Sequence, residues 1–173
     1  MEFKLENALL ILQRTPVVIR NLLTDLPDEW IQQNEGENTW SPYDIVGHLI
    51  HGEKTDWMVR VEIILGDSAD KLFEPFNRFA QFENSRGKSL DQLLAEFEYL
   101  RIDNLDRLGA LNLAANHFLA EGIHPDFGPV TLKQLLSTWV VHDLGHISQI
   151  TRVMAKQYKS EVGPWIEYIG ILK

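Results

Sequence analysis

The chain has 173 residues, 45% of them hydrophobic, which is the length and apolar content of one compact domain with its own core. Its 16 basic and 25 acidic residues give a formal net charge of -9, and the lack of any Lys/Arg cluster argues against nucleic acid as a partner. There is no cysteine, which excludes disulfides, thiolate metal ligands and a cysteine nucleophile, so a metal site must be built from histidines and carboxylates.

The first predicted helix covers residues 3–24, whose apolar residues lie roughly on one stripe and end before the turn-like segment TDLPDEW. Pro16 is a candidate position for a kink in this helix. The segment lacks the basic and long apolar regions of a signal peptide, and no run in the chain approaches the ~18 apolar residues of a membrane span. We therefore expect a cytoplasmic protein with no membrane partner.

A second helix begins at Ser41, a natural N-cap that is followed by Pro42 and by Asp44 in the first turn. This is the clearest start signal in the chain. The helix is expected to run to about Leu65 and to stop at Gly66.

Two connections and two further helices follow. Residues 67–88 are rich in Phe but interrupted by a proline and charges, which predicts an ordered excursion or short helices that cover an end of a bundle. A capping box at Ser89 starts a third helix that runs to about residue 112. The segment AEGIHPDFGPV is predicted to be a loop, and a second capping box at Thr131 starts a fourth helix over about 132–157.

Four long helices without useful strand alternation predict an all-α fold, an antiparallel four-helix bundle with long connections after helices 2 and 3. The chain contains no internal repeat, low-complexity tract or linker-like change in composition. We therefore expect a single domain over residues 1–173.

Two histidines in the fourth predicted helix, His142 and His146, lie four residues apart. On a helix this spacing separates the side chains by about 40° with a rise of ~6 Å, so both imidazoles can project toward one point. Spacing alone is weak evidence, but both histidines follow an apolar stripe that must face inward. Burying them without partners costs on the order of 1–3 kcal/mol for each unmet polar group, and a bound cation would remove that cost.

A third imidazole, His48, lies between Ile45 and Leu49 on the apolar side of the second predicted helix. A lone histidine in such a place is more often a hydrogen-bonded core residue. Together with the inward pair on another helix, it matches a three-histidine metal site with an open position for water or substrate. The sequence therefore predicts metal ligands at His48, His142 and His146.

Two further residues are candidate catalytic groups. His51, one turn after His48, could reach the rim of the site as a fourth ligand or proton carrier, although solvent exposure is the favoured expectation. Asp143 gives the motif H-D-x-x-H, close to the H-E-x-x-H of zinc peptidases, in which the acid is the general base for a metal-bound water. The shorter Asp reaches less far, so an acid that orients a histidine, or a surface residue, is the favoured interpretation.

The remaining histidines and the tryptophans are expected to be structural. His117 and His124 lie in or beside the loop before the fourth helix and are assigned structural or surface roles. The tryptophans precede, lie within or end helices, where aromatic residues normally build a core. Trp139, one turn before His142, is the exception that could wall a pocket over the metal.

The stretches NTWSPYDIVGHLIHGE and GPVTLKQLLSTWVVHDLGHISQITRVM resemble the DinB-like family of four-helix-bundle proteins. The most specific parts are the W-S-P helix start with a histidine six residues after Pro42, and the H-D-x-x-H helix with Gln149 and Arg152 beyond it. The ending VGPWIEYIGILK is also similar to that of many members. The resemblance runs from the first helix to the tail.

The resemblance implies a divalent metal held by three histidines, which map onto His48, His142 and His146, and a homodimer formed through bundle faces. The family name refers to induction by DNA damage and so to a stress response, but the acidic charge argues against reading it as DNA binding. Relatives in the wider superfamily include bacillithiol transferases and a mycothiol-dependent maleylpyruvate isomerase, in which the metal is thought to activate a low-molecular-weight thiol.

The leading hypothesis is thus a metal-dependent thiol S-transferase that presents an activated low-molecular-weight thiol to a small-molecule substrate. One alternative is a metal-dependent hydrolase that uses a metal-bound water, with His51 or Asp143 as general base. Another is a non-catalytic, stress-related protein whose metal is structural. Imidazole ligands suit Zn first, while Ni, Fe, Mn or Cu would accept the same donors.

Overall fold

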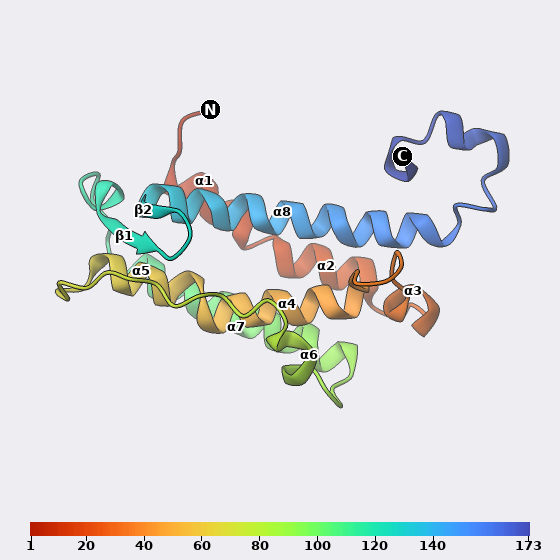
Figure 1. Cartoon of the computed structure of the whole chain (residues 1–173), viewed down its shortest axis with the longest axis horizontal. Helices are drawn as coiled ribbons and strands as arrows, with labels where there is room; N and C mark the ends of the chain where they lie inside the picture. Colours follow the sequence, from red (N-terminus) through yellow and green to blue (C-terminus); the bar gives the residue numbers. More distant parts are fainter.

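The computed structural model describes all 173 residues and shows an all-α fold in which four long segments form an antiparallel bundle (Figure 1). The predicted fold class and the long connections after the second and third segments are confirmed. No helix combines the length and the apolar character needed to cross a membrane. The segments are α1 with α2 (Leu5–Leu12 and Thr15–Leu23), α4 with α5 (Pro42–Thr55 and Trp57–Leu65), α7 (Leu90–Ala110) and α8 (Leu132–Gln157).

Hydrogen-bonded caps begin three of the four segments at the predicted residues. Ser41 Oγ accepts a hydrogen bond from the Asp44 N–H at 3.2 Å, and the Ser41 N–H donates to the Asp44 carboxylate at 3.0 Å. Each such pair satisfies two backbone N–H groups at the start of a helix, and its residue types allow the start to be predicted from sequence. The same reciprocal pair starts two other helices, at Ser89 with Gln92 and at Thr131 with Gln134.

Two of the four segments are broken. The first is interrupted at Gln13 and Arg14, and Pro16 lies in the first turn of α2, where its missing N–H removes no helical hydrogen bond. The helix is therefore interrupted just before Pro16, where a kink is expected, and a new helix begins at Thr15. The second segment, predicted as one helix, breaks at Asp56, whose backbone angles (φ -117°, ψ -75°) depart from ideal helical values.

The connections hold short elements. α3 (Asp28–Gln32) lies where a turn is predicted, and α6 (Ala80–Asn84) confirms a short helix within residues 67–88. The phenylalanines of that excursion differ in burial: Phe73 is buried, whereas Phe79 and Phe82 are exposed. The 3-10 turns η1 (His117–Leu119), η2 (Gly163–Glu167) and η3 (Gly170–Leu172) complete the chain.

The connection between α7 and α8 contains a β-hairpin where a loop is predicted: β1 (Glu121–His124) pairs antiparallel with β2 (Gly128–Thr131). Strands of four residues are too short to show alternation in a sequence. The Phe73 N–H donates to the Ile123 carbonyl at 2.9 Å, and a Cβ at Gly122 would overlap the Phe73 ring. The hairpin and the excursion therefore pack tightly together beside α5.

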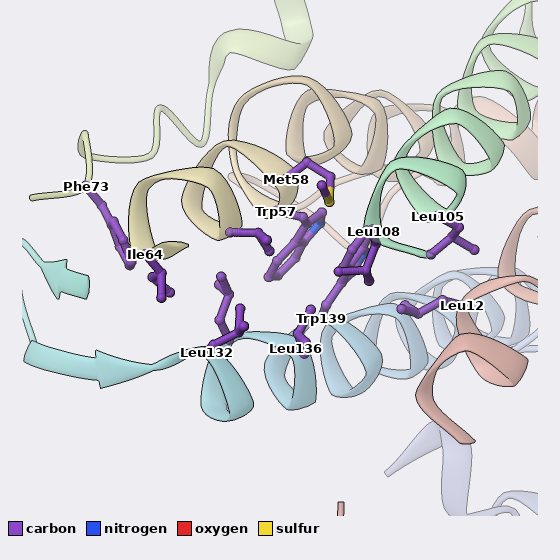
Figure 2. Packing of buried hydrophobic residues seen from close by; sticks show 12 residues of the cluster. Leu12, Trp57, Met58, Ile64, Phe73, Leu105, Leu108, Leu132, Leu136 and Trp139 are labelled. Atoms are coloured by element: carbon purple, nitrogen blue, oxygen red, sulfur yellow. The ribbon is translucent and has the colours of Figure 1, made fainter. Parts of the chain in front are cut away.

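Two apolar clusters fill the bundle, and each long segment contributes to both. One, drawn in Figure 2, lies toward the hairpin and consists of Leu12, Trp57, Met58, Val61, Ile64, Phe73, Leu105, Leu108, Leu132, Leu135, Leu136 and Trp139. The other consists of Ile19, Leu23, Ile45, Val46, Leu49, Ile50, Leu93, Leu94, Phe97, Ile150 and Val153.

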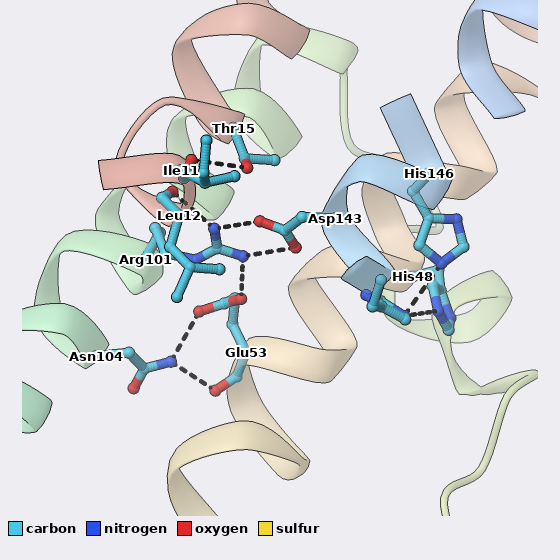
Figure 3. Close-up of polar contacts among 10 residues, drawn as sticks. Ile11, Leu12, Thr15, His48, Glu53, Arg101, Asn104, Asp143 and His146 are labelled. Carbon is cyan, nitrogen blue, oxygen red and sulfur yellow. Dashed lines mark hydrogen bonds and ion pairs between the residues drawn. The ribbon is translucent and has the colours of Figure 1, made fainter. Parts of the chain in front are cut away.

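A layer of buried charges centred on Arg101 separates these clusters along the helices (Figure 3). Arg101 Nη1 donates to the Asp143 carboxylate at 2.6 Å and to the Leu12 carbonyl at 2.8 Å, and Nη2 donates to Glu53 at 2.7 Å. Asn104 Nδ2 donates to the second Glu53 oxygen at 3.0 Å. The layer thereby ties α1, α4, α7 and α8 together.

The three charged side chains of this layer depend on one another. Burial alone would disfavour the guanidinium, but the carboxylates of Glu53 and Asp143 hold the pKa of Arg101 above its usual value. The side chains of Glu53 and Asp143 have no exposed surface. Removing the cation would leave two carboxylates in an apolar interior without a counter-ion.

Replacing Arg101 by Met should lower the free energy of unfolding by about 3–5 kcal/mol, because it strands the Glu53 and Asp143 carboxylates. Urea unfolding at pH 7, followed by circular dichroism, measures this loss. Arg107→Met is the matched control, since Arg107 lies on the same helix and pairs with Glu62 at the surface; it should change the free energy by less than about 1 kcal/mol. Equal effects of the two substitutions would contradict the buried-charge account.

Candidate metal centre

Three imidazoles from α4 and α8 converge on one point. His142 Nε2 lies 3.1 Å from His48 Nε2 and 3.1 Å from His146 Nε2 (Figure 3). The ligand atoms of all three lie within 4.8 Å of one another. Two imidazole nitrogens bound at ~2.0–2.1 Å to one tetrahedral ion would be about 3.4 Å apart. The observed separations therefore suit a single divalent ion.

Hydrogen bonds among the three histidines cannot give every ring nitrogen a partner. A ring nitrogen has either one proton or one lone pair in the ring plane, so His142 Nε2 cannot form good hydrogen bonds with both neighbours. The Nδ1 atoms of His48 and His142 are also buried without a partner. A cation that accepts the three Nε2 lone pairs would give each Nε2 atom a partner, and the ring protons of His48 and His142 would then lie on Nδ1.

Burial keeps these imidazoles neutral. It lowers the pKa of His48 to about 3 and that of His142 to about 2, and the neighbouring histidines add to both shifts. Burial also lowers the pKa of His146. A neutral imidazole offers the lone pair that a metal ion needs.

Gln149, one turn further along α8, orients His146. Its Oε1 lies 2.9 Å from His146 Nδ1 and accepts the proton of that nitrogen. This tautomer leaves Nε2 free to face His142. Such partners fix the orientation of metal-binding histidines and raise their basicity.

The cluster forms part of the wall of a cavity of about 620 Å³. Aromatic rings surround the imidazoles, with centroids 4.7 Å apart for Trp40 and His48, 5.5 Å for Phe76 and His48, and 5.0 Å for Trp57 and His142. Apolar walls around a few convergent polar groups are typical of small-molecule sites.

Trp40 belongs to a loop that is anchored to α8. Glu35 in this loop accepts hydrogen bonds from Arg152 Nε and Nη2, each at 2.8 Å, and lies 2.9 Å from Lys156 Nζ. The Arg152 hydrogen bonds, with the nearby Lys156 charge, hold the pKa of Glu35 down at about 2. The loop is thus fixed in the position that places Trp40 against His48.

The structure separates Asp143 from the histidines on either side of it in the sequence. Its side chain points away from the histidines and toward Arg101, which binds both of its carboxylate oxygens (Figure 3). Asp143 occupies the fully buried position between Trp139 and Ile150. The histidines therefore border the inward stripe on its cavity side.

His51 is buried, with 7% of its surface exposed, so the expectation of a solvent-exposed side chain is wrong. Its ring packs on Phe76, with centroids 4.8 Å apart. Three residues along a helix place it about 60° around α4 from His48, and it neither joins the ligand cluster nor lines the cavity.

Two other residues lie differently from their predicted places. Trp139 stacks on Trp57, with centroids 5.5 Å apart, and it is Trp57 that lines the cavity. His124 lines the cavity near the hairpin, whereas His117 Nδ1 accepts a hydrogen bond from the Ala114 N–H at 2.9 Å in the preceding turn.

Residues 11–150, most of the chain, match the model of the DinB superfamily. The chain belongs to the DinB superfamily. Its fold is similar to that of YfiT from Bacillus subtilis, described as a probable metal-dependent hydrolase with an unusual four-helix bundle topology; the TM-score is 0.74 at 18% sequence identity, over 88% of this chain and 86% of that one. No curated protein matches the chain.

Sequence reasoning missed the buried charges of this DinB superfamily member. Arg101 lies four residues after Phe97 and four before Leu105, which belong to the apolar stripe of the third helix. Glu53 has a comparable place in α4. A charged residue at a core position of a helix is a usable signal, because its burial requires a charged partner elsewhere.

In the metal-free protein, the cluster should make stability fall on acidification. His48 and His142 bind protons in the unfolded chain below about pH 6.5 but in the folded chain only near pH 3 and 2. The free energy of unfolding should therefore fall by up to ~1.4 kcal/mol per pH unit for each of them between those values. Urea unfolding at pH 7.5, 6.5 and 5.5 measures the slope. His142→Leu should reduce it and His117→Leu should not; an unaltered slope in His142→Leu would sink this assignment.

Proposed function

We propose that this protein is a divalent-metal-dependent enzyme that acts on a small molecule in the cavity beside the three histidines. The observation that carries the proposal is the set of ligands: three neutral imidazoles meet at the wall of an aromatic cavity, with no fourth protein ligand among them. Structural zinc sites are usually closed by four protein ligands, whereas catalytic sites keep a position open. When bound there, a divalent ion supplies a Lewis acid that lowers the pKa of a water or thiol ligand.

The residues of the chain have distinct roles in this proposal. His48, His142 and His146 hold the ion, and Gln149 keeps His146 in the tautomer that can bind it. The aromatic walls exclude water and hold the apolar part of a substrate. Zn is the first choice for an all-imidazole site, and Ni, Fe or Mn fit the same donors.

Hydrolysis is the reaction that we place first. The similarity in fold to YfiT, together with the open three-histidine site, supports it. Asp143 is an unsuitable base because Arg101 engages both of its oxygens, and His51 does not line the cavity. Transfer of a low-molecular-weight thiol is the second candidate, since it needs the same ion and an equally open position. A homodimer stays a prediction of the family resemblance.

Elemental analysis of untagged protein should find about one divalent ion per chain. His48→Ala, His142→Ala and His146→Ala should each lose most of it, while His117→Ala, outside the cluster, should retain it. Gln149→Leu should weaken binding by about 10- to 100-fold in a chelator competition, since it releases the His146 ring. Full occupancy in all three alanine variants would overturn the site.

Turnover assays on the zinc-loaded protein separate the reactions. A hydrolase should cleave 4-nitrophenyl acetate without thiol, and His142→Ala should lose at least ~100-fold in rate. A thiol transferase should instead conjugate N-acetylcysteine to 1-chloro-2,4-dinitrobenzene and leave the ester intact. A protein that binds one ion, unfolds when it is removed and performs neither reaction would favour a structural metal and contradict the proposal.

A further inference from the structure

The cavity continues well beyond the histidines. Its wall along α4 and α5 includes every fourth residue from His48 to Arg60, with Gly52 and Asp56 between them, and also Trp57. At 1.5 Å per residue, twelve residues span about 18 Å. The far end is bordered by the excursion and the hairpin, through Phe73, His124 and Phe127. This length exceeds what a water molecule or a small thiol alone would fill.

A guanidinium is fixed in the wall at that far end. Arg60 is 8% exposed, its Nε lies 2.6 Å from Asp56 Oδ1, and its Cζ lies 5.0 Å from the Phe73 ring centroid. The pair and the ring hold the planar fork in one place. No protein group accepts a hydrogen bond from its Nη atoms, these are not among the buried unpartnered atoms of the protein, and Arg60 lines the cavity. A guanidinium held in this way can donate two parallel hydrogen bonds to an oxyanion.

The charge balance of the cavity also favours an anion. The residues that line the cavity include one carboxylate, Asp56, and two guanidinium groups, those of Arg60 and Arg78. Burial raises the pKa of Asp56 to about 6, so this carboxylate is protonated more readily than an exposed one and offsets the cations less. Arg78 is exposed and lies near His48, at the other end of the cavity. Arg60 is therefore the cation that is both rigid and distant from the histidines.

We propose that the cavity takes an elongated organic oxyanion, a carboxylate or a phosphate monoester, whose charged end is held by the Nη pair of Arg60. Its reactive end would lie at the three histidines, a placement that rests on the proposed function. Anion binding at Arg60 does not require the metal. The two can therefore be tested separately.

Binding of 4-phenylbutyrate, phenyl phosphate and the neutral 4-phenylbutyramide can be followed by the fluorescence of Trp40 and Trp57, which line the cavity. The protein is first titrated after chelator treatment, so that no metal can bind the anion directly. The same titrations are then repeated with zinc-loaded protein. We expect at least one anion to bind about tenfold more tightly than the amide in the metal-free chain.

Substitutions of Arg60 and of Asp56 should have opposite effects on the affinity for the anion. Arg60→Met should weaken anion binding about tenfold, and Asp56→Asn should strengthen it about threefold, because it removes a competing negative charge. Neither should change binding of the amide more than twofold. If Arg60→Met does not fold, Arg60→Lys, which keeps the charge but loses the fork, should weaken the anion about three- to fivefold. Arg107→Met, outside the cavity, is the control.

Equal affinity for anions and amide, a loss of affinity in both Arg60 and Asp56 variants, or loss in Arg78→Met alone would each overturn the proposal. Elemental analysis of the Arg60 variant reports on the metal site separately, and it should match the unaltered protein. If the anion binds as expected but the protein retains no metal, this inference stands and the proposed function is refuted.

Discussion

The ion-pair layer around Arg101 is the constraint on which the arrangement of the bundle depends. A buried guanidinium between two buried carboxylates is tolerated only if all three groups meet with good geometry. Glu53 comes from α4 and Asp143 from α8, so their contacts with Arg101 fix the separation of the two helices that carry the histidines. A shift of either helix would break an ion pair in an interior that cannot solvate it.

Other faces of the same helices border the cavity. Asp143 projects toward Arg101 while His142 and His146, its neighbours in α8, border the cavity. On α4, Glu53 faces the charged layer and His48 faces the cavity. The ion pairs with Arg101 therefore hold in place the two helices that carry the metal-binding histidines. A coordination site needs such support for its ligands to meet at one point.

Burial has opposite consequences on the two sides of these helices. On the charged layer it is offset by full pairing of the carboxylates with Arg101. At the histidines it acts without charge compensation and lowers their pKa values, which leaves them neutral and able to bind a cation. The similarity to YfiT at 18% identity concerns the fold, so the chemistry has to be argued from these local groups.

Features that are encoded within a few neighbouring residues could be predicted from sequence. Ser41, Ser89 and Thr131 start their helices as expected, because a cap is a contact over three residues. The spacing of His142 and His146 fixed their common direction for the same reason. Only the tertiary structure decided what lies between elements: the break at Asp56, the hairpin before α8, the burial of His51 and the pairing of Asp143 with Arg101. Each of these depends on contacts between residues distant in sequence, whose geometry no local pattern contains.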